Sequence, residues 1–221
     1  MKLVCPYLNS LIEIKDGEVF SLTIENQQLF REIVEDMHYQ QNGEKGNIVV
    51  SENNTPVPFS KRVEIFESFA PFDLNSKSLI SKAVSRLEKT ANDAEHYLET
   101  SRILADIENY ITALCFSMPF DVECGRLNAG ALIKSVAISF INDYSTQLEA
   151  VVDCMNIITT LDSEKLFVTI NIRSYFPDSE MELFVKTIGD NGFKVLMLES
   201  SARKIIPGTK RLLIDSDLCE I

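Results

Sequence analysis

The chain is 221 residues long, 45% of its residues are hydrophobic, and its formal net charge at pH 7 is −12. The length and the hydrophobic content allow a sizeable buried core and exclude a disordered chain. The negative charge argues against non-specific coating of nucleic acid, so any DNA contact requires a local basic patch or a bridging metal ion.

Five cysteines are dispersed along the chain, with no CxxC pair and no neighbouring histidine cluster. This pattern favours buried free thiols in a reducing cytosol over a disulfide framework or a zinc site. The first residues lack the hydrophobic stretch of a signal peptide, and no apolar run approaches the roughly 18 residues that a membrane helix requires. We therefore expect a soluble, cytoplasmic protein with no membrane partner.

The first third of the chain combines short strands with one helix. Three apolar runs predict strands, at residues 2–5, 11–14 and 19–24. Asp16 and Gly17 indicate a hairpin turn between the second and the third of these strands. Residues 26–41 have apolar side chains at helical spacing. Residues 51–60 contain prolines and asparagines without periodicity and predict a loop, and residues 63–69 predict a further strand.

A long helical region follows. Apolar side chains recur at every third or fourth position from residue 80 to residue 114, and a capping-type sequence at residues 90–93 divides this region into two helices. Residues 129–141 and 145–161 are also predicted to be helical. The apolar stripe of this region packs either within the helices themselves or against another subunit, and the pattern leaves both possibilities open.

The core of the predicted fold lies in residues 165–200. Residues 165–171 and 194–199 are apolar runs on either side of a helical segment that begins at Asp178. Such runs indicate two buried parallel strands joined by a right-handed crossover. The prediction is therefore an α/β head domain, residues 1–74 and 162–221, split by an α-helical leg domain, residues 75–161.

The sequence offers little conventional catalytic chemistry. No stretch has the GxxxxGK[ST] spacing of a phosphate-binding loop, and the glycines at 43 and 46 are too close together to form one. Without clustered backbone amides and a lysine, a triphosphate has no cradle, which argues against ATP hydrolysis. His38 and His96 lie on separate predicted helices. Neither has a nearby cysteine or serine with which it could form a catalytic pair.

Two pairs of carboxylates have spacings that are compatible with metal binding. Asp215 and Asp217 share one face of a terminal strand, where a polar strand end is the commoner explanation. Asp121 and Glu123 follow a helix-ending proline in an irregular segment, and oxygen donors on an irregular backbone are what Ca²⁺ uses. By spacing alone, both pairs are more often solvated carboxylates than metal ligands.

Basic residues are few and unevenly distributed. They are found at Lys77, Lys82, Arg86 and Lys89 in the helical region, at Lys134 alone in an apolar helix, and at Arg203, Lys204, Lys210 and Arg211 near the C-terminus. Each group is either a solvated face or, when collected on the inside of an oligomer, a positive surface on an acidic protein.

The order of the elements and several short motifs resemble a known family. The motifs are Phe72-Asp-Leu-Asn-Ser76, Leu132-Ile-Lys134, Leu166-Phe-Val-Thr-Ile-Asn171, Tyr175-Phe-Pro-Asp-Ser-Glu180, Val195-Leu-Met-Leu-Glu199 and Leu213-Ile-Asp-Ser-Asp-Leu218. Together they resemble the short form of the CRISPR-associated adaptation protein of subtype II-A systems, a ring-forming protein needed for spacer acquisition. The similarity extends over the whole chain.

The resemblance implies a head like a degenerate RecA-type (P-loop) ATPase without nucleotide chemistry, and an α-helical leg. It implies a homotetrameric ring that encloses double-stranded DNA, prefers DNA ends, needs Ca²⁺, and works with the CRISPR adaptation integrase and the effector nuclease. Asp121 and Glu123 match the region of the family's calcium-binding acids, although the next residues, 124–126, are less acidic than the family pattern. Lys134 matches a ring-facing basic position.

Two functions from different classes follow from the sequence. The first is a non-catalytic ring that binds double-stranded DNA ends and is needed for spacer acquisition, with Ca²⁺ at Asp121 and Glu123. Its DNA-binding candidates are Lys134, Lys77, Lys82, Arg203 and Lys204. The alternative is a metal-dependent α/β phosphohydrolase or ATPase-like enzyme that uses carboxylates such as Asp215 and Asp217 with Mg²⁺.

Overall fold

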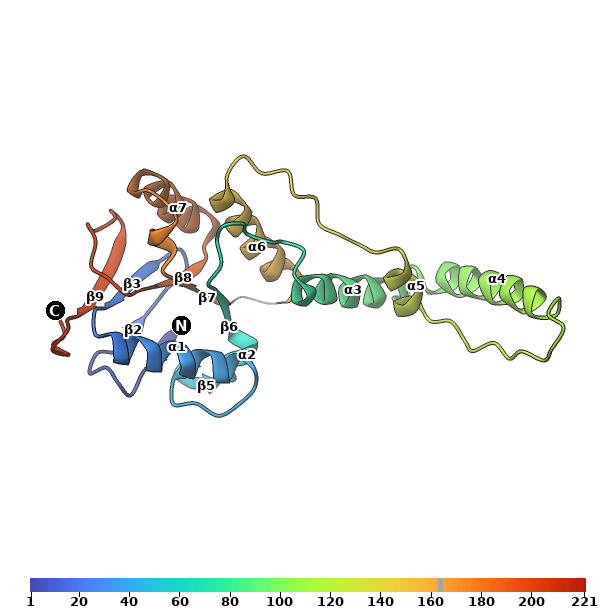
Figure 1. Cartoon of the computed structure of the whole chain (residues 1–221), viewed down its shortest axis with the longest axis horizontal. Helices are drawn as coiled ribbons and strands as arrows, with labels where there is room; N and C mark the ends of the chain where they lie inside the picture. The colour runs from blue at the N-terminus through green and yellow to red at the C-terminus, as the bar shows by residue number, and fades with distance from the viewer. Residues whose placement is uncertain (163–164) are drawn as a thin grey trace. The chain divides into compact units, whose positions relative to one another are not determined.

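A computed structural model describes residues 1–162 and 165–221 of the chain (Figure 1). Its internal contacts divide the chain into two compact units. Unit 1 consists of Met1–Phe72 together with Tyr144–Ile221, and unit 2 is the insertion Asp73–Asp143. No helix within the described part of the chain is long and apolar enough to cross a membrane.

The core of unit 1 is a five-stranded, all-parallel sheet. Its strands, in spatial order, are β6 (Val63–Phe66), β7 (Leu166–Ile170), β8 (Lys194–Glu199), β3 (Val19–Ile24) and β9 (Thr209–Ile214). All five residues of β7 and five of the six in β8 are buried, as expected for strands covered on both faces. Figure 1 shows α1 (Gln27–Gln41) and α7 (Asp178–Asn191) on opposite sides of this sheet. The predicted α/β class and the parallel pair β7–β8 are confirmed.

Unit 1 also contains a smaller antiparallel sheet. Its strands, in spatial order, are β2 (Ile12–Glu13), β1 (Lys2–Val4), β4 (Val49–Glu52) and β5 (Thr55–Val57). The predicted hairpin at Asp16 and Gly17 is wrong, because β2 pairs with β1 while β3 joins the parallel sheet. The predicted loop over residues 51–60 instead contains the β4–β5 hairpin. Its turn residues, Asn53 and Asn54, both have positive φ angles, which is the backbone of a type I′ turn.

The helices of unit 1 begin and end close to their predicted positions. Helix α1 starts directly after Asn26, whose side chain accepts a hydrogen bond from the Leu29 backbone N–H at 3.0 Å. Helix α6 (Gln147–Leu161) buries seven of its fifteen residues and packs against α7. Contacts therefore group residues 144–161 with unit 1, whereas the sequence prediction placed them in the leg. Short helices α2 (Phe59–Arg62) and η1 (Ile172–Ser174) complete this unit.

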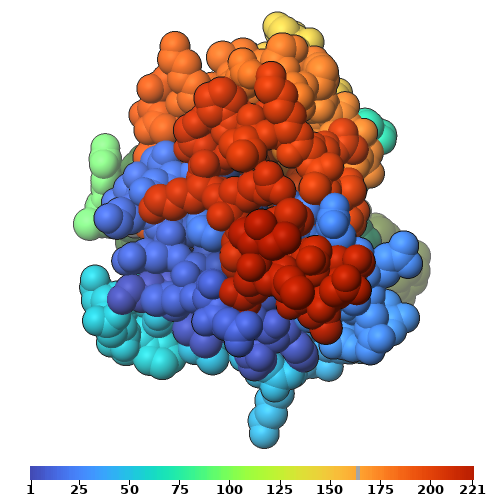
Figure 2. Space-filling view, turned by 90° about the vertical axis from the view of Figure 1, so that its left-hand side faces the viewer, coloured from blue at the N-terminus to red at the C-terminus, as the bar shows by residue number. Residues whose placement is uncertain are grey.

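The C-terminal residues lie against the N-terminal segment of unit 1. The Glu220 carboxylate accepts a hydrogen bond from the Ser10 hydroxyl at 2.6 Å, and Ile221 exchanges backbone hydrogen bonds with Leu213. Figure 2 shows this contact as the red C-terminal surface beside the blue N-terminal surface. The two ends of the chain therefore close the same unit.

Unit 2 contains α3 (Lys77–Ala91), α4 (Tyr97–Cys115) and α5 (Ala129–Ser135). The break between α3 and α4 falls where the capping-type sequence predicts it. Helix α5 ends six residues before the predicted end at residue 141, because Ala137 adopts a left-handed backbone conformation with a φ of 49°. Residues 136–146 form an irregular segment that connects α5 to α6 in the chain (Figure 1).

Candidate nucleic-acid interface and metal-binding loop

Unit 2 brings three of the predicted DNA-binding lysines onto one pair of packed helices. Helix α5 packs closely against α3. If Gly130 carried a side chain, its Cβ atom would lie only 2.8 Å from the Glu88 carboxyl group, so Gly130 and Glu88 are neighbours across the two helices. Ten residues later, the backbone of Phe140 exchanges two hydrogen bonds, at 2.7 and 3.2 Å, with the side chain of Asn75. The segment 129–140 therefore runs antiparallel to α3.

This antiparallel arrangement places Lys134 alongside the first half of α3, which carries Lys77 and Lys82. Lys134 and Lys77 are exposed, and Lys82 is half-buried. Lys134 lies in the last turn of α5, where a cation interacts favourably with the negative end of the helix dipole. In the sequence, Lys134 lies more than 50 positions after Lys77 and Lys82, and the packing of α5 against α3 brings the helices that carry them together.

Arg203 and Lys204 belong to unit 1, in the loop that joins β8 to β9. Both side chains are exposed, and the Arg203 guanidinium lies 3.4 Å from the Ser174 hydroxyl. This loop follows the carboxyl end of β8, the edge of a parallel sheet where α/β proteins usually bind their ligands. The second basic patch is therefore separate in the chain and in its unit from the lysines of α3 and α5.

The same sheet edge holds polar residues that the sequence analysis missed. Asn171 follows β7 with a left-handed φ of 54°, and its side chain accepts hydrogen bonds from the backbone and hydroxyl of Ser200 at 2.8 and 2.9 Å. Arg173 is buried and pairs with Asp178 at 2.8 Å. Glu199 is only 2% exposed. The signal that could reveal this edge is a polar residue at or directly after the end of a buried strand, as at Glu199 and Asn171.

Glu199 has an unusual protonation equilibrium. Burial raises the pKa of its carboxyl group to about 7, although a hydrogen bond from the Arg173 backbone and the nearby guanidinium groups of Arg173 and Arg203 lower the pKa. The group is therefore partly protonated near neutral pH. A carboxyl group at this position would also repel a phosphate, in contrast to the backbone amides that bind phosphates in nucleotide-binding folds.

The connection from β3 to α1 occupies the place where a phosphate-binding loop would lie in a nucleotide-binding α/β domain. It consists of Glu25 and Asn26 alone. The Asn26 side chain already accepts the Leu29 N–H, and the Glu25 carboxylate accepts the Ala202 N–H at 3.3 Å. This connection is too short to wrap around a triphosphate. Its own Glu25 N–H donates to the Ile214 carbonyl at 2.9 Å, and the Asn26 side chain occupies an N–H of the first turn of α1.

The predicted metal ligands Asp121 and Glu123 are exposed in the loop that follows α4. Asp121 lines a cavity of about 480 Å³ together with Phe116 and Phe120. The loop is attached to α4 near both ends, since the Sγ atoms of Cys115 and Cys124 are 2.9 Å apart and Glu108 accepts the Leu127 N–H at 2.6 Å. The hydrogen bond to Cys124 raises the pKa of the Cys115 thiol.

Asp121 and Glu123 fit Ca²⁺ in donor chemistry but not in donor number. Ca²⁺ takes about six to eight oxygen ligands. Among residues 1–162 and 165–221, no group of three or more histidine, cysteine or acidic side chains is placed to hold a metal ion. Backbone carbonyl groups, water or a second copy of the chain must therefore supply the remaining ligands of any calcium site here.

Asp215 and Asp217 do not share a strand face as predicted, because β9 ends at Ile214, and the Asp215 carboxylate has a structural role. One oxygen of Asp215 accepts the backbone N–H groups of Asp217 and Cys219, at 2.9 and 2.8 Å. These bonds form the turn that follows β9. The two histidines of the chain each lie beside one carboxylate. His38 is 3.1 Å from Glu67, and His96 is 2.9 Å from Asp93.

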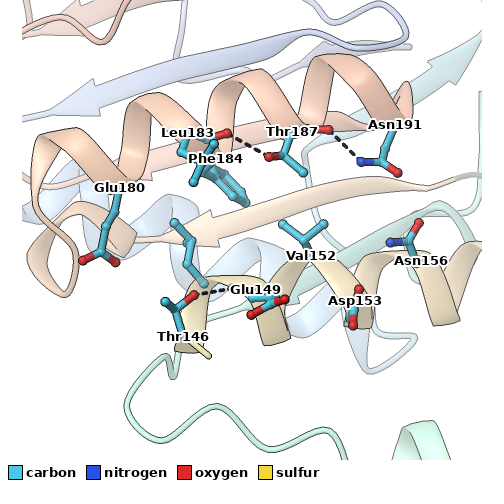
Figure 3. A pocket seen from close by; sticks show the side chains of 11 residues that line it. Thr146, Glu149, Val152, Asp153, Asn156, Glu180, Leu183, Phe184, Thr187 and Asn191 are labelled. Carbon is cyan, nitrogen blue, oxygen red and sulfur yellow. Dashed lines mark hydrogen bonds between the residues drawn. The ribbon is translucent and has the colours of Figure 1, made fainter. Parts of the chain in front are cut away.

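Unit 1 has a groove between α6 and α7 (Figure 3). It has a volume of about 500 Å³, with apolar side chains such as Val152 and Phe184 beside the carboxylates of Glu149, Asp153 and Glu180. In Figure 3, Thr146 caps α6 through the Glu149 N–H at 3.1 Å. Three carboxylates repel phosphate groups, so this groove is not part of a DNA-binding surface.

Comparisons with known proteins agree with the resemblance seen in the sequence. The family model described as CRISPR-associated protein (Cas_Csn2) matches residues 19–218. No curated protein matches the chain. Among solved structures, the crystal structure of Stu0660 of Streptococcus thermophilus is similar, with a TM-score of 0.57 and 15% identity over 90% of this chain and 68% of that chain. At this identity the likeness shows a shared fold, and the family match over most of the length shows that the chain belongs to the Cas_Csn2 family of CRISPR-associated proteins.

Proposed function

We propose that this protein forms a homotetrameric ring that binds double-stranded DNA ends during spacer acquisition in type II-A CRISPR immunity. The observation that carries the proposal is the surface of unit 2. It combines apolar side chains that the unit leaves exposed with three lysines, Lys77, Lys82 and Lys134, on the packed helices α3 and α5. The first feature suits contact with further copies of the chain, and the second suits a polyanion.

Helix α4 supports the assembly step. The structure describes every residue of this helix, and none of them is buried. Ile103, Tyr110 and Leu114 share one stripe of the helix and are 39%, 63% and 45% exposed. Exposed apolar surface of this kind marks an interaction site, and closed symmetry is the usual way in which identical chains cover it.

The lysines of α3 and α5 support the proposal of DNA binding. A chain with a net charge of −12 repels DNA unless its basic groups face the duplex and its acidic groups face away. In a tetramer, Lys77, Lys82 and Lys134 are each present four times. Contacts between lysines and phosphates position the protein on the duplex but do not distinguish one base from another. The binding is therefore independent of DNA sequence. Arg203 and Lys204 form a second candidate patch in unit 1.

Unit 1 is proposed to be a RecA-type domain that has no nucleotide chemistry. The two-residue β3–α1 connection and the absence of a phosphate-loop motif support this part of the proposal. We further propose that the ring acts with the CRISPR adaptation integrase and the effector nuclease. These partners come from the family resemblance, and unit 1 offers surfaces such as the acidic groove of α6 and α7 that do not compete for DNA.

Calcium is proposed to support assembly through Asp121 and Glu123. When bound, Ca²⁺ supplies positive charge that offsets carboxylate repulsion within the loop and between copies of the chain. The two carboxylates of one chain cannot complete the coordination, so a second copy or main-chain carbonyl groups contribute the remaining oxygens.

A gel-shift experiment tests the proposed function. Labelled linear duplex and a covalently closed circle of the same sequence are incubated with the protein, in Ca²⁺ and in a chelator. A closed ring loads by threading, so we expect the linear DNA to shift in Ca²⁺, unlabelled linear DNA to compete, and the circle to compete poorly. Equal competition by circles contradicts end binding. Cleavage of either DNA in Mg²⁺ would instead support the phosphohydrolase alternative.

A further inference from the structure

Two of the five cysteines meet where α4 ends. Cys115 is the last residue of the helix, Cys124 follows nine positions later in the loop, and their Sγ atoms are 2.9 Å apart. A disulfide bond has a sulfur–sulfur length of about 2.05 Å, so the two sulfurs need to approach by only about 0.9 Å more to bond. The predicted burial of the cysteines holds for Cys5 and Cys154 and is wrong for this pair: Cys124 is exposed and Cys115 is half-buried, which leaves both accessible to small oxidants.

The loop around the pair is held in this conformation by bonds that do not involve sulfur. Directly after α4, the N–H of Met118 donates to the Cys115 carbonyl at 3.1 Å and continues the helical path as a turn. On the other side of Cys124, the N–H of Leu127 donates to the Glu108 carboxylate at 2.6 Å. These two attachments bracket Cys124 and return the chain to α4, so the meeting of the two thiols does not depend on a chance position of a free loop.

We propose that Cys115 and Cys124 are a redox modification site that forms a reversible intrachain disulfide. With a disulfide oxidant such as oxidised glutathione, the Cys124 thiolate attacks one sulfur of the oxidant and releases one glutathione thiolate. The Cys115 thiolate then attacks the Cys124 sulfur and releases the second. Two protein thiols and one glutathione disulfide thus give one protein disulfide and two glutathione molecules, and excess glutathione reverses both steps.

The disulfide closes a ring of the chain that contains residues 116–123, and therefore both Asp121 and Glu123. Closing the ring restricts the conformations available to these two carboxylates. This consequence rests on the proposed calcium function, whereas formation of the disulfide does not. Exposed disulfides of this kind are labile and are typical of regulatory rather than structural bonds, which is consistent with a chain whose other cysteines are dispersed.

The first experiment tests the bond itself, with the full chain, in chelator and without DNA. The protein is equilibrated in glutathione buffers of increasing oxidised fraction, blocked with N-ethylmaleimide, and digested. Trypsin leaves both cysteines in one peptide, residues 103–126, because no lysine or arginine lies between Arg102 and Arg126. Chymotrypsin, which cuts after Phe116 and Phe120, separates them. We expect a 103–126 peptide that has lost two hydrogens and two chymotryptic peptides that stay joined until reduction.

Matched variants distinguish the pair from ordinary reactive thiols. In Cys115→Ser or Cys124→Ser, the remaining thiol should accumulate a glutathione adduct at the ratio that closes the wild-type disulfide. Cys219→Ser removes an exposed cysteine of unit 1 and should leave the disulfide unchanged. Separate glutathione adducts on Cys115 and Cys124 in the wild type, or disulfides between chains, would overturn the proposal.

A second measurement separates the disulfide from its consequence for calcium. The rise in Tm on adding Ca²⁺ is compared between the reduced and the oxidised protein, with Cys124→Ser in the same two buffers as the control. We expect the Ca²⁺-dependent rise in Tm to differ between reduced and oxidised wild type and to be the same in the two Cys124→Ser samples. This result supports a coupling between the disulfide and calcium binding. An identical rise in both wild-type forms overturns the coupling and leaves the disulfide to be judged by peptide mapping alone.

Discussion

Single residues determine where charge is tolerated in this protein, and Glu199 is the clearest case. The carboxyl group is buried at the carboxyl edge of the parallel sheet, and its pKa is raised from 4.5 to about 7. A group with a raised pKa binds its proton more tightly in the folded chain than in the unfolded chain. Its contribution to stability is complete below about pH 4.5 and is lost as the pH rises through 7.

We therefore expect Glu199→Gln to reduce the loss of stability between pH 5 and pH 8. A shift of this size corresponds to at most about 3 kcal/mol of unfolding free energy, and the glutamine oxygen can still accept the Arg173 N–H. Urea unfolding at the two pH values measures the effect, with the exposed Glu182→Gln as the control. An equal pH dependence in wild type and Glu199→Gln would contradict the raised pKa.

Lys134 is the residue on which the DNA-binding proposal depends most. Reversing its charge with Lys134→Glu should weaken binding to linear duplex of any sequence, because four copies of the change act together in a tetramer. The salt dependence should also become shallower, by about 0.9 in the log–log slope for each DNA phosphate that the protein no longer neutralises. Fluorescence anisotropy over a salt series measures both quantities.

The matched control is Lys186→Glu, which makes the same charge change at an exposed position of α7 in unit 1. Its effect should be limited to the small change in overall charge. If Lys134→Glu keeps the wild-type salt slope, Lys134 is not part of the contact surface. In that case Arg203 and Lys204 become the patch to test.

At the scale of the elements, α4 is a helix with no buried residue along its described length. Tyr110→Glu places a charge in the middle of the exposed apolar stripe and should shift the protein from tetramer toward monomer. Ala105→Glu adds the same charge on the opposite side of the same helix, about 140° away, and should leave assembly unchanged. Sedimentation in Ca²⁺ measures the oligomeric state. A wild-type protein that sediments as a compact monomer would refute the tetramer.

The loop after α4 is the second element with a testable role. The double change Asp121→Asn with Glu123→Gln removes two carboxylates without altering side-chain size, so the rise in Tm on adding Ca²⁺ should become smaller. Asp106→Asn, at an exposed position of α4, is the control for loss of charge. Thermal unfolding with and without chelator measures the rise. If it is unchanged, calcium binds elsewhere, and Asp215 with Asp217 are tested next.

The elements differ in how well the sequence predicts them. β7, α7 and β8 were predictable because an apolar run, a helical repeat and a second apolar run are local signals. The pairing of β2 with β1 was not, because two sheets compete for the same strands and only tertiary contacts decide between them. For the same reason the sequence did not assign α6 to unit 1, since its partner α7 lies beyond β7 in the chain.

The candidate sites also differ in whether a local sequence signal or only the folded chain reveals them. Asp121 and Glu123 share a short segment and could be proposed from spacing and resemblance. The meeting of Cys115 with Cys124 depends on how an irregular loop returns to α4, for which the sequence carries no periodic signal. The cluster of Asn171, Arg173 and Glu199 joins residues from two strand ends, so it becomes visible only when β7 and β8 are placed side by side.

For the molecule as a whole, the sheet resembles a nucleotide-binding domain while its connections do not. We expect no phosphate release above background when the protein is incubated with ATP and Mg²⁺, because the β3–α1 connection has only two residues and the chain has no phosphate-loop motif. Asp215→Asn serves as the diagnostic variant. Hydrolysis in the wild type that disappears in this variant would support the alternative enzyme.

The place where unit 2 is inserted has a consequence for how the protein can be altered. The chain leaves unit 1 at Phe72, whose backbone N–H donates to the Gln147 side chain at 2.7 Å, just after the chain has returned. Both ends of the insertion are therefore anchored at one spot on unit 1. Chain segments joined at neighbouring points can be lengthened or shortened at little entropic cost. Evolution can thus vary the reach of the leg independently of the sheet, and an engineer can replace residues 73–143 with a short linker and retain unit 1 as a module.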